Sequence, residues 1–402
     1  WKELGEYIRK GVYPPIPFRA YPMTDIKTAF RTMSRGLHIG KSVVSFQEPG
    51  IALADFIGTM PMDREGTCLV TGGLSGFGLA SARWLVECGV KYLVLVGRSG
   101  ASREEAKAAL GHFEHQGVKV AVECIDISIE SQVEDMIQRI GQTFPPLKGI
   151  IHAAMVWDDT AIAKMDAENL RRVFAPKIMG AWNLHIHTLD KPLDFFVCYS
   201  SISTCIGNAG QGNYVAANFF LESLARYRKE HGLPALTIGW GPIGEVGYVA
   251  RNTEIKDHLL RFGAGEVGLE LAWKALCHGL REKSSVMGFY HAEWNTMATY
   301  NRKIKNSPRF AKLVRKDSET DESGDSEVKR ILDLPHEDRI VKLTGKLARE
   351  ISRFLGIDYA RISLEGPIAE LGIDSFTVVE LMVRIEKVFG MRLQQMTFLK
   401  PG

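Results

Sequence analysis

A turn rich in glycine at residues 71–78 is the first segment whose composition could perform chemistry. It follows a short apolar run at 67–70 and leads into a helical pattern that extends to Cys88. Glycines here allow a tight turn and let the backbone approach a pyrophosphate, which then lies at the helix N-terminus. The pattern predicts a dinucleotide site, with a plain connecting turn as the alternative. The residues predicted to contact the nucleotide are Thr71, Gly72, Gly73, Leu74, Ser75, Gly76 and Phe77.

The end of the next apolar run indicates which nucleotide would bind. That run continues as Gly97-Arg98-Ser99, where an NAD-preferring protein usually carries an acidic residue. A guanidinium and a hydroxyl suit a 2′-phosphate, so the sequence favours NADPH. The alternative is that Arg98 lies on a solvated loop. Asp126, at the end of the third run, is predicted to contact the adenine.

These turns need strands to position them, and short β-rich runs alternate with helix-length amphipathic stretches through the middle of the chain. Helical patterns lie, for example, at 102–116 and 131–140. Continuous apolar strands separated by helices predict an α/β fold, a Rossmann-type doubly wound parallel sheet covered on both faces. From residue 335 onward strand signals are missing, which predicts a small helical bundle. The predicted strands lie at 67–70, 92–96, 118–125, 149–151, 195–198 and 235–238.

Length and composition restrict the class of protein. The chain has 402 residues, of which 45% are hydrophobic and 24% charged, the balance of a globular enzyme of two or three domains. No apolar run reaches the ~20 residues that span a bilayer. A net charge of +3 without a basic tract gives no support for nucleic-acid binding. The six cysteines form no C-x-x-C pair, so we expect reduced, buried thiols, no metal site and a cytoplasmic location.

The strongest chemical signal is Tyr199-Ser200-Ser201, then Gly207, then Gly210-Gln-Gly-Asn-Tyr214-Val-Ala-Ala-Asn218. With Gly149-Ile-Ile-His-Ala-Ala154 and Gly239-Trp-Gly-Pro242, it resembles the ketoreductase domain of a polyketide synthase or animal-type fatty acid synthase. That domain is a branch of the short-chain dehydrogenase/reductase superfamily. Ordinary members use Tyr-x-x-x-Lys, whereas Asn218 stands four residues after Tyr214 here. The resemblance implies that the cation is Lys177, in Phe174-Ala-Pro-Lys177-Ile-Met-Gly180, and that Ala153 contacts the cofactor.

The chemistry implied by this resemblance is reduction of a ketone. Hydride transfer leaves an alkoxide that must be protonated, and a phenol with a pKa near ~10 is a poor donor unless an ammonium stabilises the phenolate. The resemblance therefore assigns Tyr214 as general acid, Lys177 as the charge that tunes it, and Ser201 as a donor to the carbonyl oxygen. Asn218 would hold the lysine or a proton-relay water. Taken singly, Tyr214 could be a core aromatic, Ser201 a strand-end cap and Lys177 a surface side chain.

Two nearby segments bear on the substrate. Val156-Trp157-Asp158-Asp159 stands where many ketoreductases carry Leu-Asp-Asp, a feature associated with one facial preference, the B type. Trp157 replaces the leucine here. The segment 246–267 lies where the family has its substrate lid.

A second resemblance lies in the C-terminal segment. Leu371-Gly-Ile-Asp374-Ser375-Phe376 resembles the attachment motif of acyl carrier proteins, whose serine takes 4′-phosphopantetheine. The apolar residues that follow have helical spacing, which places Ser375 at a helix N-terminus, favourable for the phosphodiester charge. The alternative is that Asp374 or Ser375 only caps a helix. A helical pattern at 340–354 favours the carrier. The apolar stripe consists of Val378, Leu381, Met382, Ile385, Val388 and Phe389.

The first forty-seven residues resemble the C-terminal tail of medium-chain reductases, through Gly11-Val-Tyr-Pro-Pro-Ile-Pro17 and Tyr21-Pro-Met-Thr-Asp-Ile26. In a synthase this would be the end of an enoyl reductase, without activity of its own. A helix and strand that dock on the ketoreductase are the alternative. The predicted domains are 1–47 (reductase remnant), 48–64 (linker), 65–312 (ketoreductase), 313–333 (acidic linker) and 334–402 (carrier, C-terminally truncated).

This order of domains resembles the C-terminal part of a highly reducing, iterative polyketide synthase of fungal type. The implied reaction is NADPH-dependent reduction of a β-ketoacyl thioester, held on the phosphopantetheine of Ser375, to the β-hydroxyacyl thioester. The implied partners are a phosphopantetheinyl transferase and the other domains of the synthase, so we expect a piece of a longer polypeptide. A fatty acid synthase, or a carrier and scaffold fragment with a silent reductase fold, are the alternatives. Neither nucleic acid nor a membrane is an expected partner.

Overall fold

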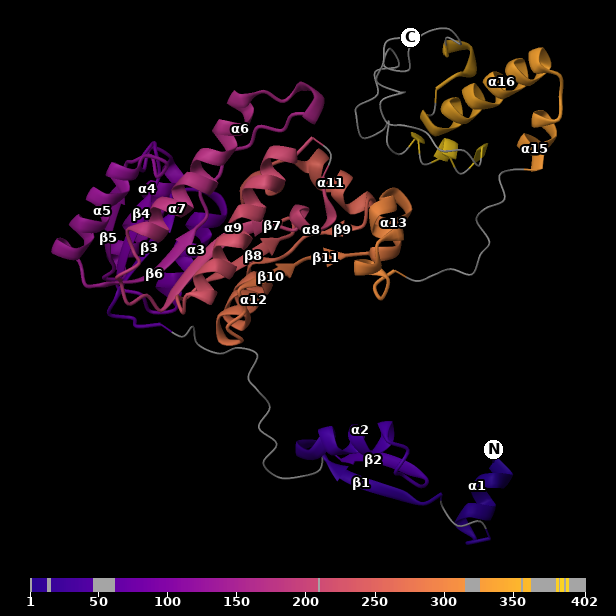
Figure 1. Cartoon of the computed structure of the whole chain (residues 1–402), viewed down its shortest axis with the longest axis horizontal. Helices are drawn as coiled ribbons and strands as arrows, with labels where there is room; N and C mark the ends of the chain where they lie inside the picture. Colours follow the sequence, from indigo (N-terminus) through magenta and orange to yellow (C-terminus); the bar gives the residue numbers. More distant parts are fainter. Residues whose placement is uncertain are drawn as a thin grey trace. The chain divides into compact units, whose positions relative to one another are not determined.

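The computed structural model describes residues 2–12, 16–45, 62–208, 210–314, 326–355, 357–362, 381–382, 384–386 and 388–389. The chain divides into two compact units, residues 1–58 and 59–402 (Figure 1).

The N-terminal unit contains a strand–helix–strand motif. Strands β1 (Phe18–Pro22) and β2 (Lys41–Ser45) pair in parallel, with Phe18 opposite Lys41 and Pro22 opposite Ser45. Helix α2 (Ile26–Ser34) follows the 3₁₀ turn η1 (Met23–Asp25) and connects them, and α1 (Lys2–Arg9) precedes them. Most apolar side chains of this unit are exposed, and Tyr21 and Ala29 are its buried apolar residues among those described.

The second unit contains a seven-stranded sheet in which every pairing is parallel. The spatial order is β10-β8-β7-β6-β3-β4-β5, so the chain reverses direction across the sheet between β3 and β6. In such sheets ligands bind at the carboxyl ends of the strands beside that reversal. The strands are β3 (Thr67–Thr71), β4 (Tyr92–Val96), β5 (Lys119–Glu123), β6 (Leu147–His152), β7 (Phe195–Ser201), β8 (Leu236–Trp240) and β10 (Val286–Phe289).

Helices cover both faces of this sheet because successive side chains of each strand point to opposite faces. Along β4, Leu93 and Leu95 join the core under one set of helices, while Val94 and Val96 join the core under the other. The first set is α3 (Gly76–Glu87), α4 (Glu104–His115) and α12 (Leu269–Arg281). The second set is α5 (Glu130–Thr143), α7 (Gly180–Ile186) and α9 (Gly212–Glu230) (Figure 1).

Shorter elements surround the carboxyl edge of the sheet. A small cluster of apolar residues packs the segment after β11 against the turn that follows β7; it includes Met297, Ile304 and Phe310, with Cys205 and Ile206 against them. The elements are η2 (Ile162–Lys164), α6 (Ala167–Phe174), η3 (Ala175–Met179), α8 (Ser203–Ile206), α10 (Gly247–Ala250), α11 (Thr253–Arg261), β9 (Ala264–Gly265), β11 (His291–Ala292), α13 (Trp294–Tyr300), α14 (Arg302–Asn306) and η4 (Pro308–Phe310).

The C-terminal segment is helical where the structure describes it. It contains α15 (Ser326–Leu332), α16 (His336–Leu355) and η5 (Tyr359–Arg361). Ile351 of α16 packs against Leu381, Met382 and Ile385, three members of the predicted apolar stripe. The largely buried Glu350 also bonds to Arg353 and Arg384 on the two sides of this core, at 2.9 and 3.1 Å.

The predicted doubly wound α/β sheet is confirmed, and β4 has the predicted bounds. The sequence interpretation missed β10, which is a short edge strand with Gly288 inside it. The expectation of buried thiols holds for Cys68, Cys198 and Cys277 but is wrong for Cys124, which is exposed; all six thiols are unpaired. Among the described residues, no helix is long and apolar enough to cross a membrane.

Candidate active site

The glycine turn lies at the carboxyl end of β3, where the sheet reverses direction. Gly72 has a φ of +67°, and a Cβ there would lie 3.1 Å from the backbone of Ala153 and Ala154. A Cβ on Gly78 would overlap the carbonyl of Gly72. The backbone is therefore packed too closely for side chains at these positions, as a turn that receives a pyrophosphate requires.

The helix that leaves this turn presents unused donors. Ser75 is the N-cap of α3, yet its side chain makes no capping hydrogen bond to the first turn. The first N–H groups of a helix have no partner within the helix and attract anions. The residues present thus fit a dinucleotide, with Gly76 and Phe77 in the first turn of the helix.

The residues predicted to select the nucleotide follow the neighbouring strands at the same edge of the sheet. Arg98 and Ser99 follow β4 and are both exposed. Asp126 follows β5, and its Oδ1 accepts hydrogen bonds from the backbone N and Oγ of Ser128 at 2.9 and 2.7 Å. One carboxylate oxygen of Asp126 therefore holds its own loop, and its predicted contact with adenine stays a prediction.

The four residues predicted to perform the chemistry come together at the carboxyl end of β7. Ser201 is the last residue of β7, and Tyr214 lies in the first turn of α9. Asn218 is one helical turn further along, and its Nδ2 donates to the carbonyl of Tyr214 at 2.9 Å. Lys177 reaches the group from η3, with its Nζ 5.4 Å from the centroid of the Tyr214 ring.

A π-helical turn carries Lys177 into the interior. The five residues of η3 connect α6 to α7, and Pro176 within it lacks a backbone N–H. Such wide turns are frequent at functional sites. Lys177 is only 2% exposed, so the surface alternative is wrong, and its Nζ donates to the carbonyl of Tyr199 at 2.9 Å. Burial lowers the pKa of Lys177 to about 8, which leaves it mostly protonated at neutral pH.

Tyr214 is a protonated phenol in this environment. Burial raises its pKa to about 12, and the nearby side chain of Asn218 offsets part of that increase, while the charge of Asp159 adds to it. Ser201 is also close to the phenol and acts to lower the pKa. The Oγ of Ser201 accepts from the N and Oγ of Ser203 at 3.2 and 2.9 Å, so its own proton points to the side where the Tyr214 phenol lies.

Helix α9 presents a row of polar groups to the end of β7. Tyr214, Asn218 and Glu222 are spaced four residues apart and share one helix face. Oε1 of Glu222 accepts from Oγ1 of Thr204 at 2.6 Å and from Oγ of Ser200 at 3.3 Å. Oδ1 of Asn218 is buried and has no hydrogen-bond partner among the described residues. An acceptor of this kind fits a water or a lysine ammonium, as the sequence predicted.

An aromatic ring covers the general-acid candidate. Trp157, in the loop after β6, stacks on Tyr214 with ring centroids 4.6 Å apart and an interplanar angle of 27°. Trp157 is 41% exposed, so it lies between the phenol ring and the surface. Sequence reasoning identifies Trp157 only as a departure from the family pattern, because 57 residues separate it from its ring partner.

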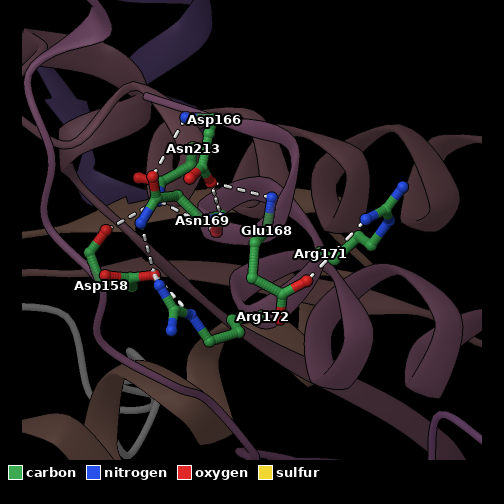
Figure 2. Close-up of polar contacts among 7 residues, drawn as sticks. All are labelled: Asp158, Asp166, Glu168, Asn169, Arg171, Arg172 and Asn213. Atoms are coloured by element: carbon green, nitrogen blue, oxygen red, sulfur yellow. Dashed lines mark hydrogen bonds and ion pairs between the residues drawn. The ribbon is translucent and has the colours of Figure 1, made fainter. Parts of the chain in front are cut away.

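Polar contacts hold the loop that carries Trp157 (Figure 2). The carboxylate of Asp158 accepts from Nε and Nη2 of Arg172, both at 2.8 Å, and from Nδ2 of Asn169 at 3.1 Å. Nδ2 of Asn213 donates to the carbonyl of Asp158 at 2.8 Å. Because Asn213 Oδ1 also accepts from the backbone N of Tyr214 at 2.8 Å, the loop and the start of α9 are joined. In Figure 2 the Glu168–Arg171 pair connects to these contacts through Asp166, whose Oδ1 accepts from the backbone N of Glu168 and of Asn169.

His152, at the end of β6, is a site residue without a predicted role. Its Nδ1 is 2.8 Å from Oγ1 of Thr71, and its ring is 1% exposed. Burial and the charge of Lys177 lower the pKa of His152 to about 3, so it is neutral at physiological pH. The sequence signal that could have identified His152 is its place in the run Gly149-Ile-Ile-His-Ala-Ala154, which belongs to the ketoreductase resemblance.

The structure describes the predicted lid segment but not the predicted attachment residue Ser375. The predicted lid segment contains α10 and α11, and its Gly247 backbone would lie 3.3 Å from a Cβ on Gly76. The lid thus approaches the glycine turn. Ser375, the predicted attachment residue, lies outside the described residues, as does most of the acidic linker.

Comparisons with known proteins give two family matches. Residues 66–245 match the KR domain, and residues 345–400 match the phosphopantetheine attachment site. A highly reducing polyketide synthase of Cordyceps militaris is 32% identical over 397 residues, which cover 94% of this chain and 15% of that protein. A phenolphthiocerol/phthiocerol polyketide synthase of Mycobacterium tuberculosis is 33% identical over 405 residues, which cover 98% of this chain and 18% of that protein. The chain thus spans 15 to 18% of the length of these relatives.

Solved structures resemble the sheet domain. An A1-type ketoreductase matches with a TM-score of 0.58 and 31% identity, over 62% of this chain and 52% of that one. The ketoreductase from the first module of phoslactomycin biosynthesis in Streptomyces sp. HK803 matches with a TM-score of 0.60 and 29% identity, over 64% of this chain and 60% of that one.

Proposed function

Because this chain carries a ketoreductase domain of the polyketide synthase type followed by a phosphopantetheine-attachment domain, we propose that it reduces a carrier-bound β-ketoacyl thioester with NADPH. The product is the β-hydroxyacyl thioester. The observation that carries the proposal is the convergence of Tyr214, Ser201, Asn218 and Lys177 at the end of β7.

The chain's own residues account for proton delivery. The hydroxyl of Ser201 donates a hydrogen bond to the substrate carbonyl oxygen and keeps its own proton, which holds the carbonyl beside the phenol of Tyr214. Tyr214, protonated at neutral pH, gives its proton to the developing alkoxide. The ammonium of Lys177, kept in place by the Tyr199 carbonyl, stabilises the phenolate. The unpartnered Oδ1 of Asn218 holds the water that returns the proton.

The dinucleotide supplies the hydride when it is bound. The glycine turn and the uncapped start of α3 fit its pyrophosphate. Arg98 and Ser99 would hold the 2′-phosphate, which supports NADPH over NADH. A comparison of rates with the two nucleotides, in wild type and in Arg98→Ala, tests this preference; equal use of both by wild type contradicts it.

Ser375 would carry the substrate on a 4′-phosphopantetheine arm installed by a phosphopantetheinyl transferase. Supporting this, Ser375 lies within the residues that match the attachment family. A carrier in the same chain raises the effective concentration of substrate at Tyr214. The other partners are the remaining domains of a parent synthase. We further propose that residues 1–47 are the end of an enoyl reductase, on the basis of their sequence pattern and strand–helix–strand motif.

The decisive experiment follows NADPH oxidation by the full chain with a soluble β-ketoacyl thioester. Tyr214→Phe removes the proton donor and is expected to lower kcat by about 10²- to 10⁴-fold. Tyr227→Phe, an exposed tyrosine on the same helix, is the matched control and keeps the wild-type rate. Equal rates in wild type and Tyr214→Phe would contradict the assignment of the general acid. If wild type neither reduces the thioester nor binds NADPH, the reductase fold is silent.

A further inference from the structure

A cavity of about 270 Å³ lies beside the turn that follows β7, and none of its lining residues takes part in the proposed proton transfer. It is formed between α8, which begins two residues after Ser201, and the 3₁₀ turn η4. The residues that line it are Cys205, Ile206, Gly207, Ser307, Arg309 and Phe310.

Hydrogen bonds fix one wall of this cavity to the reaction site. Ser203, the first residue of α8, donates twice to Oγ of Ser201. Thr204, the next residue, donates to Glu222 at 2.6 Å, on the same helix as Tyr214. The cavity wall therefore keeps a constant position relative to the groups that face the substrate carbonyl.

Arg309 supplies a cation with unused donors. Its Nη1 donates to the carbonyl of Cys205 at 3.5 Å and contacts Sγ of the same residue at 3.7 Å. Within the part of the chain that the structure describes, no carboxylate forms an ion pair with it. A guanidinium has five N–H donors, and its planar arrangement matches a phosphate.

The rest of the lining combines a hydroxyl group with apolar side chains, which favours a ligand that carries both a phosphate and an apolar part. Oγ of Ser307 accepts from the backbone N of Arg309 at 3.3 Å, so its own proton is available. Ile206 and Phe310 add apolar surface beside the guanidinium. The cavity thus offers phosphate-binding groups on η4 and an apolar wall together, against the short helix α8 that begins two residues after Ser201.

We propose that this cavity binds the phosphate end of a phosphopantetheine arm whose thioester carbonyl lies at Ser201 and Tyr214. This inference rests on the proposed function. In phosphopantetheine the phosphate is attached next to a gem-dimethyl carbon, and a flexible diamide chain separates both from the thioester. Arg309 and Ser307 match the phosphate, and Ile206 and Phe310 match the methyl groups.

The cavity is separate from the predicted pyrophosphate site. The glycine turn follows β3, whereas α8 follows β7, and β6 lies between these strands. Two strand spacings amount to about 10 Å. The phosphates of the nucleotide and the phosphate of the arm would therefore bind to different groups.

The test uses two soluble substrates that differ only in the phosphate: a β-ketoacyl thioester of phosphopantetheine and the same thioester of pantetheine. With the full chain we expect about tenfold higher kcat/KM for the phosphorylated substrate, as one charge-assisted contact gives. Arg309→Met removes this preference and leaves the pantetheine rate unchanged. Lys312→Met, an exposed cation three residues away that does not line the cavity, is the control and keeps the preference.

Two results would overturn the inference: an Arg309→Met variant that retains the preference, or one that lowers both rates equally. Calorimetry with phosphopantetheine alone gives a readout that needs no turnover, and wild type should bind it more tightly than Arg309→Met. If no thioester is reduced while this difference in binding persists, the proposed function fails and the cavity assignment stands. If thioesters are reduced without any preference for phosphate, the proposed function stands and the cavity assignment fails.

The arm could come from the carrier or from a free coenzyme A thioester, and a single-turnover measurement distinguishes them. The full chain is loaded with a β-ketoacyl phosphopantetheine on Ser375 and mixed with NADPH. A slower single turnover in Arg309→Met assigns the cavity to the carrier's arm. An unchanged single turnover, together with a lost preference for the soluble phosphorylated substrate, assigns it to free thioesters.

Discussion

Replacing Lys177 by Met is expected to abolish reduction and, at neutral pH, to stabilise the fold. The ammonium of Lys177 is buried, and burial lowers its pKa from 10.5 to about 8. Because the folded state disfavours the charged form, the wild-type protein carries a free-energy cost wherever the lysine is protonated in both states. Methionine has a similar length and carries no charge, so it removes that cost.

The magnitude follows from the pKa and one hydrogen bond. A shift from 10.5 to about 8 corresponds to about 3 kcal/mol of unfolding free energy. The substitution also removes the bond from Nζ to the carbonyl of Tyr199, which costs about 1 kcal/mol. At pH 7 the variant should therefore be more stable by about 2 kcal/mol. Above pH 8 the folded lysine is neutral while the unfolded one is still charged, so wild-type stability rises by about 1.4 kcal/mol per pH unit. Wild type therefore overtakes the variant at about pH 9.5.

Denaturant unfolding of the full chain, followed by tryptophan fluorescence at pH 7 and pH 10, measures both values. Six of the seven tryptophans lie between residues 84 and 294, so the signal reports on the sheet domain rather than on the C-terminal helices. A variant that is less stable at pH 7, or a difference that does not change with pH, would refute the reasoning. Retained reduction by Lys177→Met would refute the role of the ammonium.

Two further predictions concern the same site. In wild type, kcat for reduction should fall as pH rises above about 8. Lys177 loses its proton in this range, while Tyr214, with a pKa of about 12, keeps its own. A pH–rate profile that stays flat to pH 10 would contradict this prediction. Gly78→Ala should abolish NADPH binding measured by fluorescence titration, because its Cβ would overlap the Gly72 carbonyl. Gly111→Ala, where no atom lies within 4 Å, is the matched control, and undiminished binding by Gly78→Ala would show that the turn can shift.

Local patterns were sufficient to predict most of the sheet. Strand β4 was predicted because Tyr92–Val96 is a continuous apolar run, buried from both faces, and turn residues follow it. Strand β10 was not predicted, because Val286–Phe289 is short, half-buried and interrupted by Gly288. An edge strand of this kind is formed by its pairing with β8, which is a tertiary contact that no local window contains.

The sequence proposed the members of the candidate site, through the resemblance to ketoreductases, but not their arrangement. The structure brings the proposed residues Tyr214, Ser201, Asn218 and Lys177 together, and their roles stay predictions. The stack of Trp157 on Tyr214 depends on a loop held by Asp158, and such long-range contacts leave no periodic signal. The spacing of Tyr214, Asn218 and Glu222 is a detectable helical row, and it could have led to Glu222.

The row of polar groups on α9 also bears on how this protein can change. A helix fixes the distance between successive turns at about 5 Å, so Tyr214, Asn218 and Glu222 keep their separation whatever happens in the connecting loops. The predicted lid helices α10 and α11 belong to a different stretch of chain, which begins after β8. Exchange of residues 247–261 between relatives should therefore transfer substrate preference while the proton-transfer geometry is inherited unchanged. Such an exchange would show that selectivity and chemistry are carried by separate stretches of this chain.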